Sequence, residues 1–217
     1  MSLAKFVLLT VISASSSVAF AGAMSTGGLV NDTLNKGILL NFQSIGAGID
    51  VTSRQAYLDL VKKNLLDTSA TTVVEASVGQ EGEITSCLEF KNVDDLVSTK
   101  IEIEAIVGNS SITKLETIPK CDSKATKFTK GLVVSFESLG AGIELKARED
   151  YLNIVAQNFF SANINLVKQQ PAGPEGEVIS CIQFNDATGF SSTQKELRKL
   201  VKNSSITTLK TVSTCSN

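Results

Sequence analysis

An internal repeat with a period of 94 residues constrains this chain more than any other feature. Residues 36–121 align with residues 130–215 without a gap, and about 33 of the 86 aligned pairs are identical. Identity at this level over such a stretch is far above that of unrelated segments. A unit of this length is too long for a solenoid repeat and suits one small domain. The sequence therefore predicts two tandem copies of one domain, produced by duplication.

Each copy has the pattern strand, helix, strand, strand, helix, strand. The first copy predicts strands over residues 38–42, 71–76, 83–90 and 112–118, with helices opened by Thr52 or Ser53 and by Asp94 or Asp95. The second copy predicts strands over residues 132–136, 166–169, 178–184 and 206–212, with helices over 151–160 and 193–201.

This element order in a small domain favours an α+β, ferredoxin-like fold, in which two helices cover one face of an antiparallel sheet. Alternation along residues 83–90 agrees with it, since Leu88 is expected to face the helices and Cys87 the open face. We expect residues 36–121 and 130–215 each to fold alone.

The N-terminus has the pattern of a cleavable signal peptide over residues 1–23. Lys5 supplies a positive charge, residues 6–12 form a short apolar core, and cleavage is expected after Ala21 or Ala23. The apolar run is far shorter than the roughly 20 residues needed to span a bilayer. No cysteine follows the cleavage region, so lipid attachment is not expected. These features predict a periplasmic or secreted protein without membrane insertion, with a flexible N-terminus over 24–35, a linker over 122–129 and a second domain over 130–217.

Composition excludes several classes of function. The formal net charge is -2, and no basic stripe of the kind that binds nucleic acid is present. Histidine is absent, which removes the commonest general acid/base and the commonest transition-metal ligand. We therefore predict a protein that is not an enzyme and that needs no metal or cofactor.

Four cysteines occupy equivalent places in the two copies, at Cys87, Cys121, Cys181 and Cys215. An even number in an exported protein favours disulfides, although four cysteines allow three connectivities. The equal spacings favour Cys87–Cys121 and Cys181–Cys215. In a ferredoxin-like sheet, however, the first strand separates the third from the fourth by about 10 Å. The tail after the fourth strand must then fold back across the open face. A redox pair or a zinc site is disfavoured because no C-x-x-C occurs.

Three segments that match closely between the two copies predict a candidate binding edge. In a ferredoxin-like domain the first strand–helix loop, the central hairpin and the loop before the last strand emerge at one end, and the copies match best there. The candidate residues are Gly46, Gly48, Asp50, Glu81 and Glu83, with their counterparts Gly140, Gly142, Glu144, Glu175 and Glu177.

This edge allows several interpretations. Glycines before a helix can cradle an anion, but Asp50 and Glu144 would repel one, so a simple tight turn is favoured. The glutamates could bind a cation or a basic partner. The favoured interpretation is structural, with the hairpin glutamates accepting bonds from neighbouring loop amides and serine hydroxyls. Glycoside hydrolysis by a carboxylate pair is disfavoured, because no aromatic platform for a sugar is near.

Three hypotheses for function follow. The first is a binding or accessory protein of the periplasm or extracellular space, acting on an unknown protein or small-molecule partner through an open sheet face and free edge strands. The second is an envelope protein that self-associates. The third, disfavoured, is a carboxylate-dependent hydrolase, since no complete catalytic constellation is visible.

Overall fold

A computed structural model describes residues 36–44, 46, 48–79, 81–108, 110–122 and 128–215. The predicted signal peptide, the N-terminal segment 24–35 and residues 123–127 of the linker lie outside these residues. None of the helices within the described ranges has the length and apolar character required to cross a membrane.

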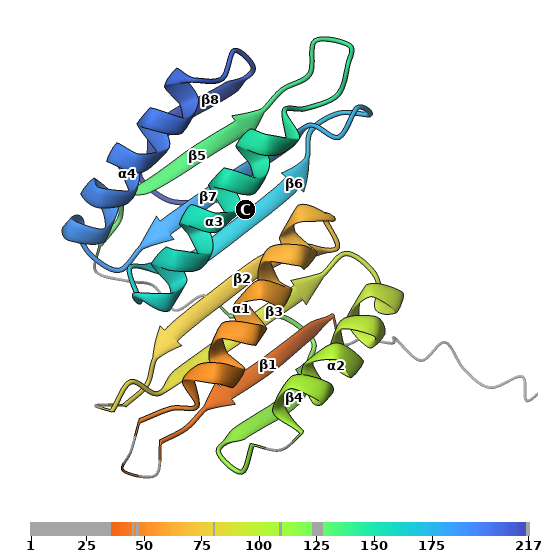
Figure 1. Cartoon of the computed structure of the whole chain (residues 1–217), viewed down its shortest axis with the longest axis vertical. Coiled ribbons are helices and arrows are strands. Elements are labelled where there is room, and N and C mark those ends of the chain that lie inside the picture. The colour runs from red at the N-terminus through yellow and green to blue at the C-terminus, as the bar shows by residue number, and fades with distance from the viewer. Residues whose placement is uncertain are drawn as a thin grey trace, which may run out of the picture. The chain divides into compact units, whose positions relative to one another are not determined.

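Twelve elements follow in the order β-α-β-β-α-β, β-α-β-β-α-β (Figure 1). We call residues 36–121 the first half and residues 130–215 the second half. The first half contains β1 (Gly37–Phe42), α1 (Val51–Leu66), β2 (Ala70–Ser77), β3 (Ile84–Phe90), α2 (Val93–Val107) and β4 (Thr113–Ile118). The second half contains β5 (Gly131–Phe136), α3 (Leu145–Phe160), β6 (Ile164–Pro171), β7 (Val178–Phe184), α4 (Ala187–Lys202) and β8 (Thr207–Val212).

All eight strands form one antiparallel sheet in the order β4-β1-β3-β2-β6-β7-β5-β8. The predicted α+β class and the ferredoxin-like strand order within each half are confirmed. The repeat did not predict that the two halves share one sheet. They do so because β2 of the first half pairs with β6 of the second half. Independent folding of each half stays a prediction.

The junction between β2 and β6 has a local two-fold axis. Val73 lies opposite Val167, its own counterpart in the repeat, while Val74 lies opposite Leu166 and Thr72 opposite Lys168. Helices α1 and α3 pack side by side above this junction (Figure 1). The two halves therefore meet as the subunits of a symmetric dimer would, within one chain.

The main core lies between the sheet and its four helices and runs through both halves. Alternate strand residues such as Leu40, Leu88, Val134 and Ile182 are fully buried in it. Fully burying one such side chain contributes about 1.5–3 kcal/mol. The helices thus cover one face of the sheet, as the alternation predicts.

Both disulfides lie on the other face. Cys87 bonds Cys121 and Cys181 bonds Cys215, each with a Cα–Cα distance of 5.7 Å. The pairing is the one that the equal spacings favour. In each half the chain leaves the edge strand and crosses the open face, so that the intervening strand β1 or β5 is bridged. By the chain-entropy model each such loop stabilises the fold by about 3–4 kcal/mol.

The helix starts differ from those predicted because asparagine and aspartate cap them earlier. Asp50 accepts from the Ser53 amide to cap α1, so Thr52 and Ser53 are inside the helix. Asn92 caps α2 instead of Asp94 or Asp95. Asp186 caps α4, which begins at Ala187 rather than at the predicted Thr193. Helix α3 likewise begins at Leu145 rather than Tyr151.

Candidate functional site

The predicted binding edge contains a closed network of hydrogen bonds in the first half. The Ser44 hydroxyl donates to the Glu81 carboxylate at 2.6 Å and accepts from the amides of Gly46 and Gly48 at 3.2 and 3.0 Å. Glu83 accepts from the Glu81 amide at 3.1 Å. One serine therefore joins the β1–α1 loop to the β2–β3 hairpin.

The second half repeats this network with equivalent atoms. The Ser138 hydroxyl donates to Glu175 and accepts from the amides of Gly140 and Gly142 at 3.1 and 3.0 Å. Glu177 accepts from the Glu175 amide at 2.8 Å. These contacts support the structural interpretation of the hairpin glutamates over a cation site.

The two glycines of each loop have backbone angles that side chains disfavour. Gly48 and Gly142 have φ of 82° and 81°, and Gly46 and Gly140 have φ of 93° and 94°. The left-handed conformation explains why glycine occupies these positions. It also turns the amides of Gly46 and Gly48 onto one serine hydroxyl, so they are not left open for an anion.

The acidic residues after the glycines differ between the halves. Asp50 accepts from the Ser53 amide at 3.0 Å and from its hydroxyl at 2.7 Å. These bonds, the amide bond foremost, lower the pKa of Asp50. Glu144 makes no side-chain bond to the start of α3, where Ala147 stands in place of Ser53. Asp50 thus acts as a helix cap.

The third predicted segment bonds mainly within itself. Ser110 and Thr113 share a hydroxyl–hydroxyl bond of 3.0 Å, and Ser204 donates to Thr207 at 2.8 Å. Among the described residues, no group of three or more Cys, Asp or Glu side chains is placed to hold a metal ion. The serine hydroxyl joins the glycine loop to the hairpin, whereas the third segment is joined to the end of the first strand by a backbone bond from the Gln43 amide to the Ile112 carbonyl at 2.9 Å.

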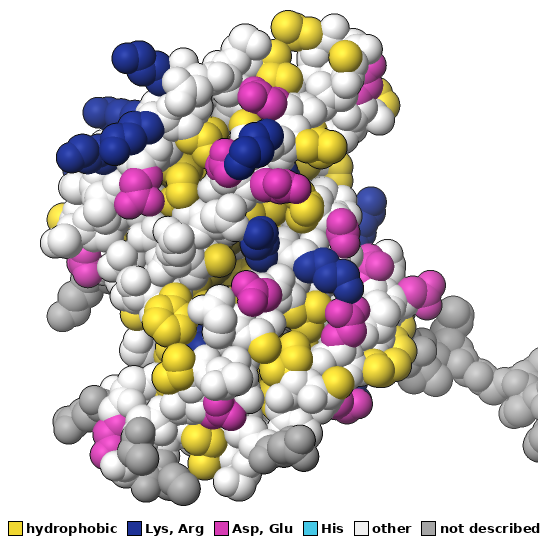
Figure 2. Space-filling model, in the orientation of Figure 1, with side chains coloured by type: hydrophobic (Ala, Val, Ile, Leu, Met, Phe, Trp, Pro, Cys, Tyr) yellow, Lys and Arg dark blue, Asp and Glu magenta, His cyan; other side chains and the backbone are white. Residues whose placement is uncertain are grey.

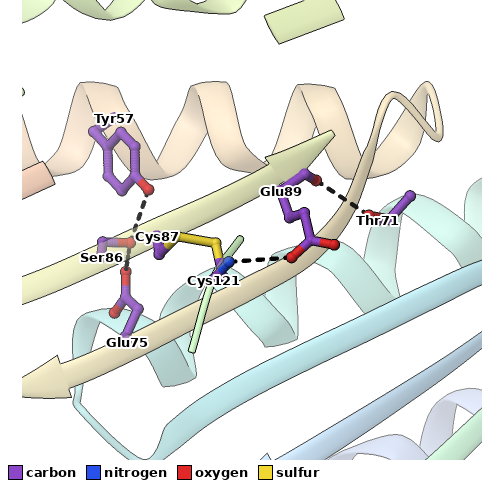
Figure 3. The surroundings of a disulfide bond; sticks show 7 residues. All are labelled: Tyr57, Thr71, Glu75, Ser86, Cys87, Glu89 and Cys121. Atoms are coloured by element: carbon purple, nitrogen blue, oxygen red, sulfur yellow. Dashed lines mark hydrogen bonds between the residues drawn. A yellow bond between two sulfur atoms is a disulfide. The ribbon is translucent and has the colours of Figure 1, made fainter. Parts of the chain in front are cut away.

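A buried polar network that the sequence did not reveal lies under the helices of the first half. Arg54 donates to both Glu75 oxygens, at 2.8 and 2.5 Å, and both side chains are almost fully buried. Ser86 donates to Glu75 at 2.8 Å and bonds the Tyr57 hydroxyl at 2.7 Å (Figure 3). The Arg54 guanidinium also lies 5.3 Å from the Phe42 ring centre. The two Nη atoms of Arg54 are thus paired with the carboxylate, while its buried Nε atom has no partner. Removing either member of such a buried pair leaves an uncompensated charge.

The second half keeps the arginine and replaces the carboxylate by an amide. Arg148 donates to Gln169 at 2.6 Å and to the Leu65 carbonyl of the first half at 2.8 Å. Gln169 donates to the carbonyls of Leu65 and Ala70, both at 2.8 Å. Burial lowers the pKa of Arg148. This pair joins the halves rather than serving a site.

Two hollows on the open face are the cavities best placed to hold a ligand. The first hollow, of about 590 Å³, lies against the first half and is lined by Leu39, Val74, Ala76, Thr85, Cys87, Ile118 and Lys120. The second hollow, of about 500 Å³, is lined by the repeat counterparts of all seven, namely Val133, Lys168, Gln170, Ile179, Cys181, Val212 and Thr214. The repeat therefore forms the same hollow twice.

The two hollows differ in polarity where β2 and β6 form their floors. Val74 and Ala76 line the first hollow, whereas Lys168 and Gln170 occupy the equivalent places in the second. Glu89 also lines the second hollow, where its carboxylate accepts from the Cys121 amide at 3.2 Å (Figure 3). The first hollow is thus the more apolar of the two.

Each hollow also contains residues from the opposite half, among them two that are counterparts in the repeat. Asn165 of β6 lines the first hollow and is 7% exposed, and its Oδ1 atom has no hydrogen-bond partner. Thr71, the counterpart of Asn165, lines the second hollow and donates to the Glu89 carbonyl at 3.3 Å. A buried acceptor without a partner costs about 1–3 kcal/mol. It is the sort of group that a ligand donor would satisfy.

The sequence does not predict the hollows, because each depends on the β2–β6 junction and on the tails that contain Cys121 and Cys215. A signal was nevertheless present. From 70/164 to 78/172 the copies are identical only at Val73/Val167, whereas they match closely over the hairpin that follows this stretch. Divergence concentrated in one strand could have pointed to β2 and β6.

Comparisons with known proteins show similarity of fold alone. No protein-family model and no curated protein matches the sequence. A candidate monooxygenase from Lactobacillus acidophilus is 9% identical, with a TM-score of 0.32, over 81% of this chain and 91% of that one. A microcompartments protein from Desulfitobacterium hafniense is 10% identical, with a TM-score of 0.30, over 83% and 94%. Aspartate kinase from Synechocystis is 11% identical, with a TM-score of 0.35, over 82% of this chain and 29% of the kinase. Similarity at this level carries no function to the chain.

Proposed function

We propose that this chain is an exported, non-enzymatic binding protein whose first hollow holds a small, largely apolar molecule with one hydrogen-bond donor. The observation that carries the proposal is Asn165 Oδ1, a buried acceptor without a partner in the wall of an apolar hollow of about 590 Å³. Small-molecule sites are typically apolar cavities of this size with a few polar groups that fix orientation.

Export is supported by two independent features. Residues 1–23 have the charge, apolar core and small residues of a signal peptide. Cys87–Cys121 and Cys181–Cys215 are disulfides, which persist in oxidising compartments. A non-enzymatic role is supported by the absence of histidine and by the loop glutamates, whose carboxylates accept bonds from the loops themselves.

The charge around the first hollow narrows the ligand class. Lys120 and Asp122 lie between the two hollows and line both, and in the first they are combined with a floor of Val74 and Ala76. A ligand with an aromatic or aliphatic body, an N–H or O–H group for Asn165 and a polar end for Lys120 matches this lining. The second hollow also contains Val74, but Lys168 and Gln170 make it more polar.

Anilinonaphthalene sulfonate has such a body, an N–H group and an anion, and its fluorescence reports binding. We expect the folded chain to bind the dye with one principal site. Ala76→Phe should abolish this site by filling the hollow, and Gln170→Phe, the equivalent change in the second hollow, should leave dye binding unchanged. Equal effects of the two substitutions would contradict the proposal.

Asn165→Leu tests the hydrogen bond separately. The variant removes an unpaired buried acceptor, so its free energy of unfolding should be equal or higher. Dye affinity should fall by a factor of about 3 to 10, the worth of one neutral hydrogen bond. Unchanged affinity in a stably folded Asn165→Leu variant would remove Asn165 from the site.

A further inference from the structure

We propose that copies of this chain associate head to tail, with the edge formed by α4 and β8 of one copy bound to the edge formed by α2 and β4 of the next. The proposal goes beyond the ligand site and uses a different part of the molecule. The partner is a second copy of the same chain.

The sheet ends in two strands that can continue it. Within the described part of the chain, β4 and β8 each pair with a strand on one side only. Strand direction alternates throughout the sheet, so β8 of one copy would meet β4 of the next in antiparallel orientation. An unpaired edge is a template for such pairing.

The outermost helices carry opposite charge. Helix α2 has four carboxylates and one lysine, whereas α4 has one carboxylate and four basic residues. Figure 2 shows the Lys and Arg side chains gathered over α4. The edge strands differ less in charge, since β4 has exposed Lys114 and Glu116 and β8 has exposed Lys210, the counterpart of Glu116. The opposite charge of the two edges therefore comes mainly from the helices.

The side of α2 turned away from α1 also leaves apolar side chains uncovered. Thr99 bonds Asn64 of α1 and Glu102 bonds Lys63 of α1, so this side of α2 faces inward. Helical spacing turns Val97 and Ile101 outward, and they are 49% and 61% exposed. They form an apolar strip beside the β4 edge.

Helix α4 presents basic residues with long apolar stems on its matching side. Gln194 bonds Thr211 of β8 at 3.1 Å, which places this side of α4 over the edge strand. Arg198, one turn further, and Lys195 are exposed beside it. Their aliphatic stems can cover Val97 and Ile101 while their charges approach the carboxylates of α2.

These charges select head-to-tail association over a symmetric pair. Two α4 edges would place basic residues against basic residues, which costs free energy. An α4 edge against an α2 edge brings opposite charges together. Because this contact uses different surfaces on the two copies, it does not close on itself and permits longer chains.

Sedimentation of the purified, oxidised chain tests the association. We expect the mean mass to rise with protein concentration. Association should weaken on the order of tenfold between about 0.1 M and about 1 M salt, because the screening length falls from about 10 Å to about 3 Å. A chain that remains monomeric at every concentration would overturn the proposal.

Two blocked variants test its direction. Lys195→Glu with Arg198→Glu blocks the α4 edge, and Val97→Arg with Ile101→Arg blocks the α2 edge. Each variant alone should be monomeric, and an equimolar mixture should form dimers that grow no further. Lys62→Glu with Lys146→Glu, on the inner helices α1 and α3, matches the charge change without removing a bond to α2 and should still associate.

The outcomes separate this proposal from others. Dimers formed by either blocked variant alone would indicate a symmetric contact and overturn the head-to-tail arrangement. Loss of association in the inner-helix control would show that total charge, not the edge, is responsible. Dye binding in the first hollow should be the same in all these variants, so failure here leaves the ligand site unaffected.

Discussion

Arg54 in α1 and Arg148 in α3 occupy equivalent positions in the two halves but have different hydrogen-bond partners. Arg54 forms an ion pair with Glu75 of its own half. Arg148 lies beside Gln169, and both donate to the backbone of the first half. A carboxylate at position 169 could not donate to the Leu65 and Ala70 carbonyls. The buried arginine of the first half is therefore paired within its own half. The buried arginine and glutamine of the second half depend on backbone carbonyls of the first half.

The hollows show a second difference of the same kind. The same seven repeat positions line both, yet β2 contributes Val74 and Ala76 where β6 contributes Lys168 and Gln170. Because the two halves have equivalent backbone folds, the difference in polarity between the two hollows comes from their side chains. Two equivalent hollows in one chain can therefore have different ligands, which two identical subunits could not.

Separating the halves should have the largest effect on this comparison. Residues 36–121 keep the Arg54–Glu75 pair, so we expect this fragment to fold cooperatively when oxidised, with reduced stability. Residues 130–215 lose the Leu65 and Ala70 carbonyls and leave the Arg148 charge with an amide alone. We therefore replace the expectation from the repeat, that this half folds alone, with the prediction that it is largely unfolded. Circular dichroism melts of both oxidised fragments measure this. Equal stability of the fragments would contradict the asymmetry.

Exchanging the partners of the two arginines should have the next largest effect. Glu75→Gln leaves a buried guanidinium without its counter-charge and should cost about 3–5 kcal/mol of unfolding free energy. Gln169→Glu supplies a counter-charge to Arg148 but removes two donated bonds, and should cost about 1–3 kcal/mol. Urea unfolding at neutral pH measures both. A stabilised Gln169→Glu variant would show that the junction bonds matter less than the unpaired charge.

Alkaline pH should destabilise the fold through its two buried tyrosines. Burial raises the pKa of Tyr151 to about 12 and that of Tyr57 still further. Unfolding exposes both at a pKa near 10, so stability is unaffected below that pH. From about pH 10 to pH 12 it should fall by about 1.4 kcal/mol per pH unit for each tyrosine. Urea unfolding at several alkaline pH values should show a shallower fall for Tyr151→Phe than for the unchanged chain. Identical slopes would contradict these burial effects.

The loop networks should show the smallest effect and the closest agreement between halves. Ser44→Ala and Ser138→Ala each remove the hydroxyl that joins loop to hairpin, and each should cost about 1 kcal/mol. Glu81→Gln with Glu83→Gln should lower the melting temperature, and millimolar calcium should leave the melting temperature of the unchanged chain as it is. A calcium-induced rise would restore the cation-site interpretation.

The sequence predicted the features that depend on repeated local pattern. The strand order, the helix-covered face and the disulfide pairing follow from hydrophobic alternation and from equal cysteine spacing. The favoured interpretation of the hairpin glutamates agrees with the Ser44–Glu81 and Ser138–Glu175 bonds, whereas Glu83 and Glu177 accept from amides of their own hairpins. These inferences compare each position with its neighbours along the chain.

The rest depends on contacts between the halves, which no local pattern contains. Nothing in Val73 or Val167 indicates that each faces the other across a two-fold axis. Arg54 and Arg148 are identical in the alignment, and only the partner positions 75 and 169 reveal that their surroundings differ. Asn165 is an ordinary polar strand residue in the sequence, and its burial arises only from contact with the opposite half. The helix starts were misplaced for a smaller reason, since asparagine and aspartate caps were passed over for residues inside the helices.

The disulfide-bonded tails also determine how the chain would carry tension. A force between Lys36 and Cys215 enters β1, passes along the chain to Cys87, and then crosses to Cys121 through the sulfur atoms. It crosses again from Cys181 to Cys215. Each 34-residue separation then hides about 110 Å of contour length at about 3.3–3.6 Å per residue. The edge strands β4 and β8 lie inside these shielded loops, so they cannot be peeled from the sheet by pulling until the bonds are reduced. In its oxidised form the molecule is a short tether with protected edge strands, and in its reduced form a longer one from which β8 can be pulled directly.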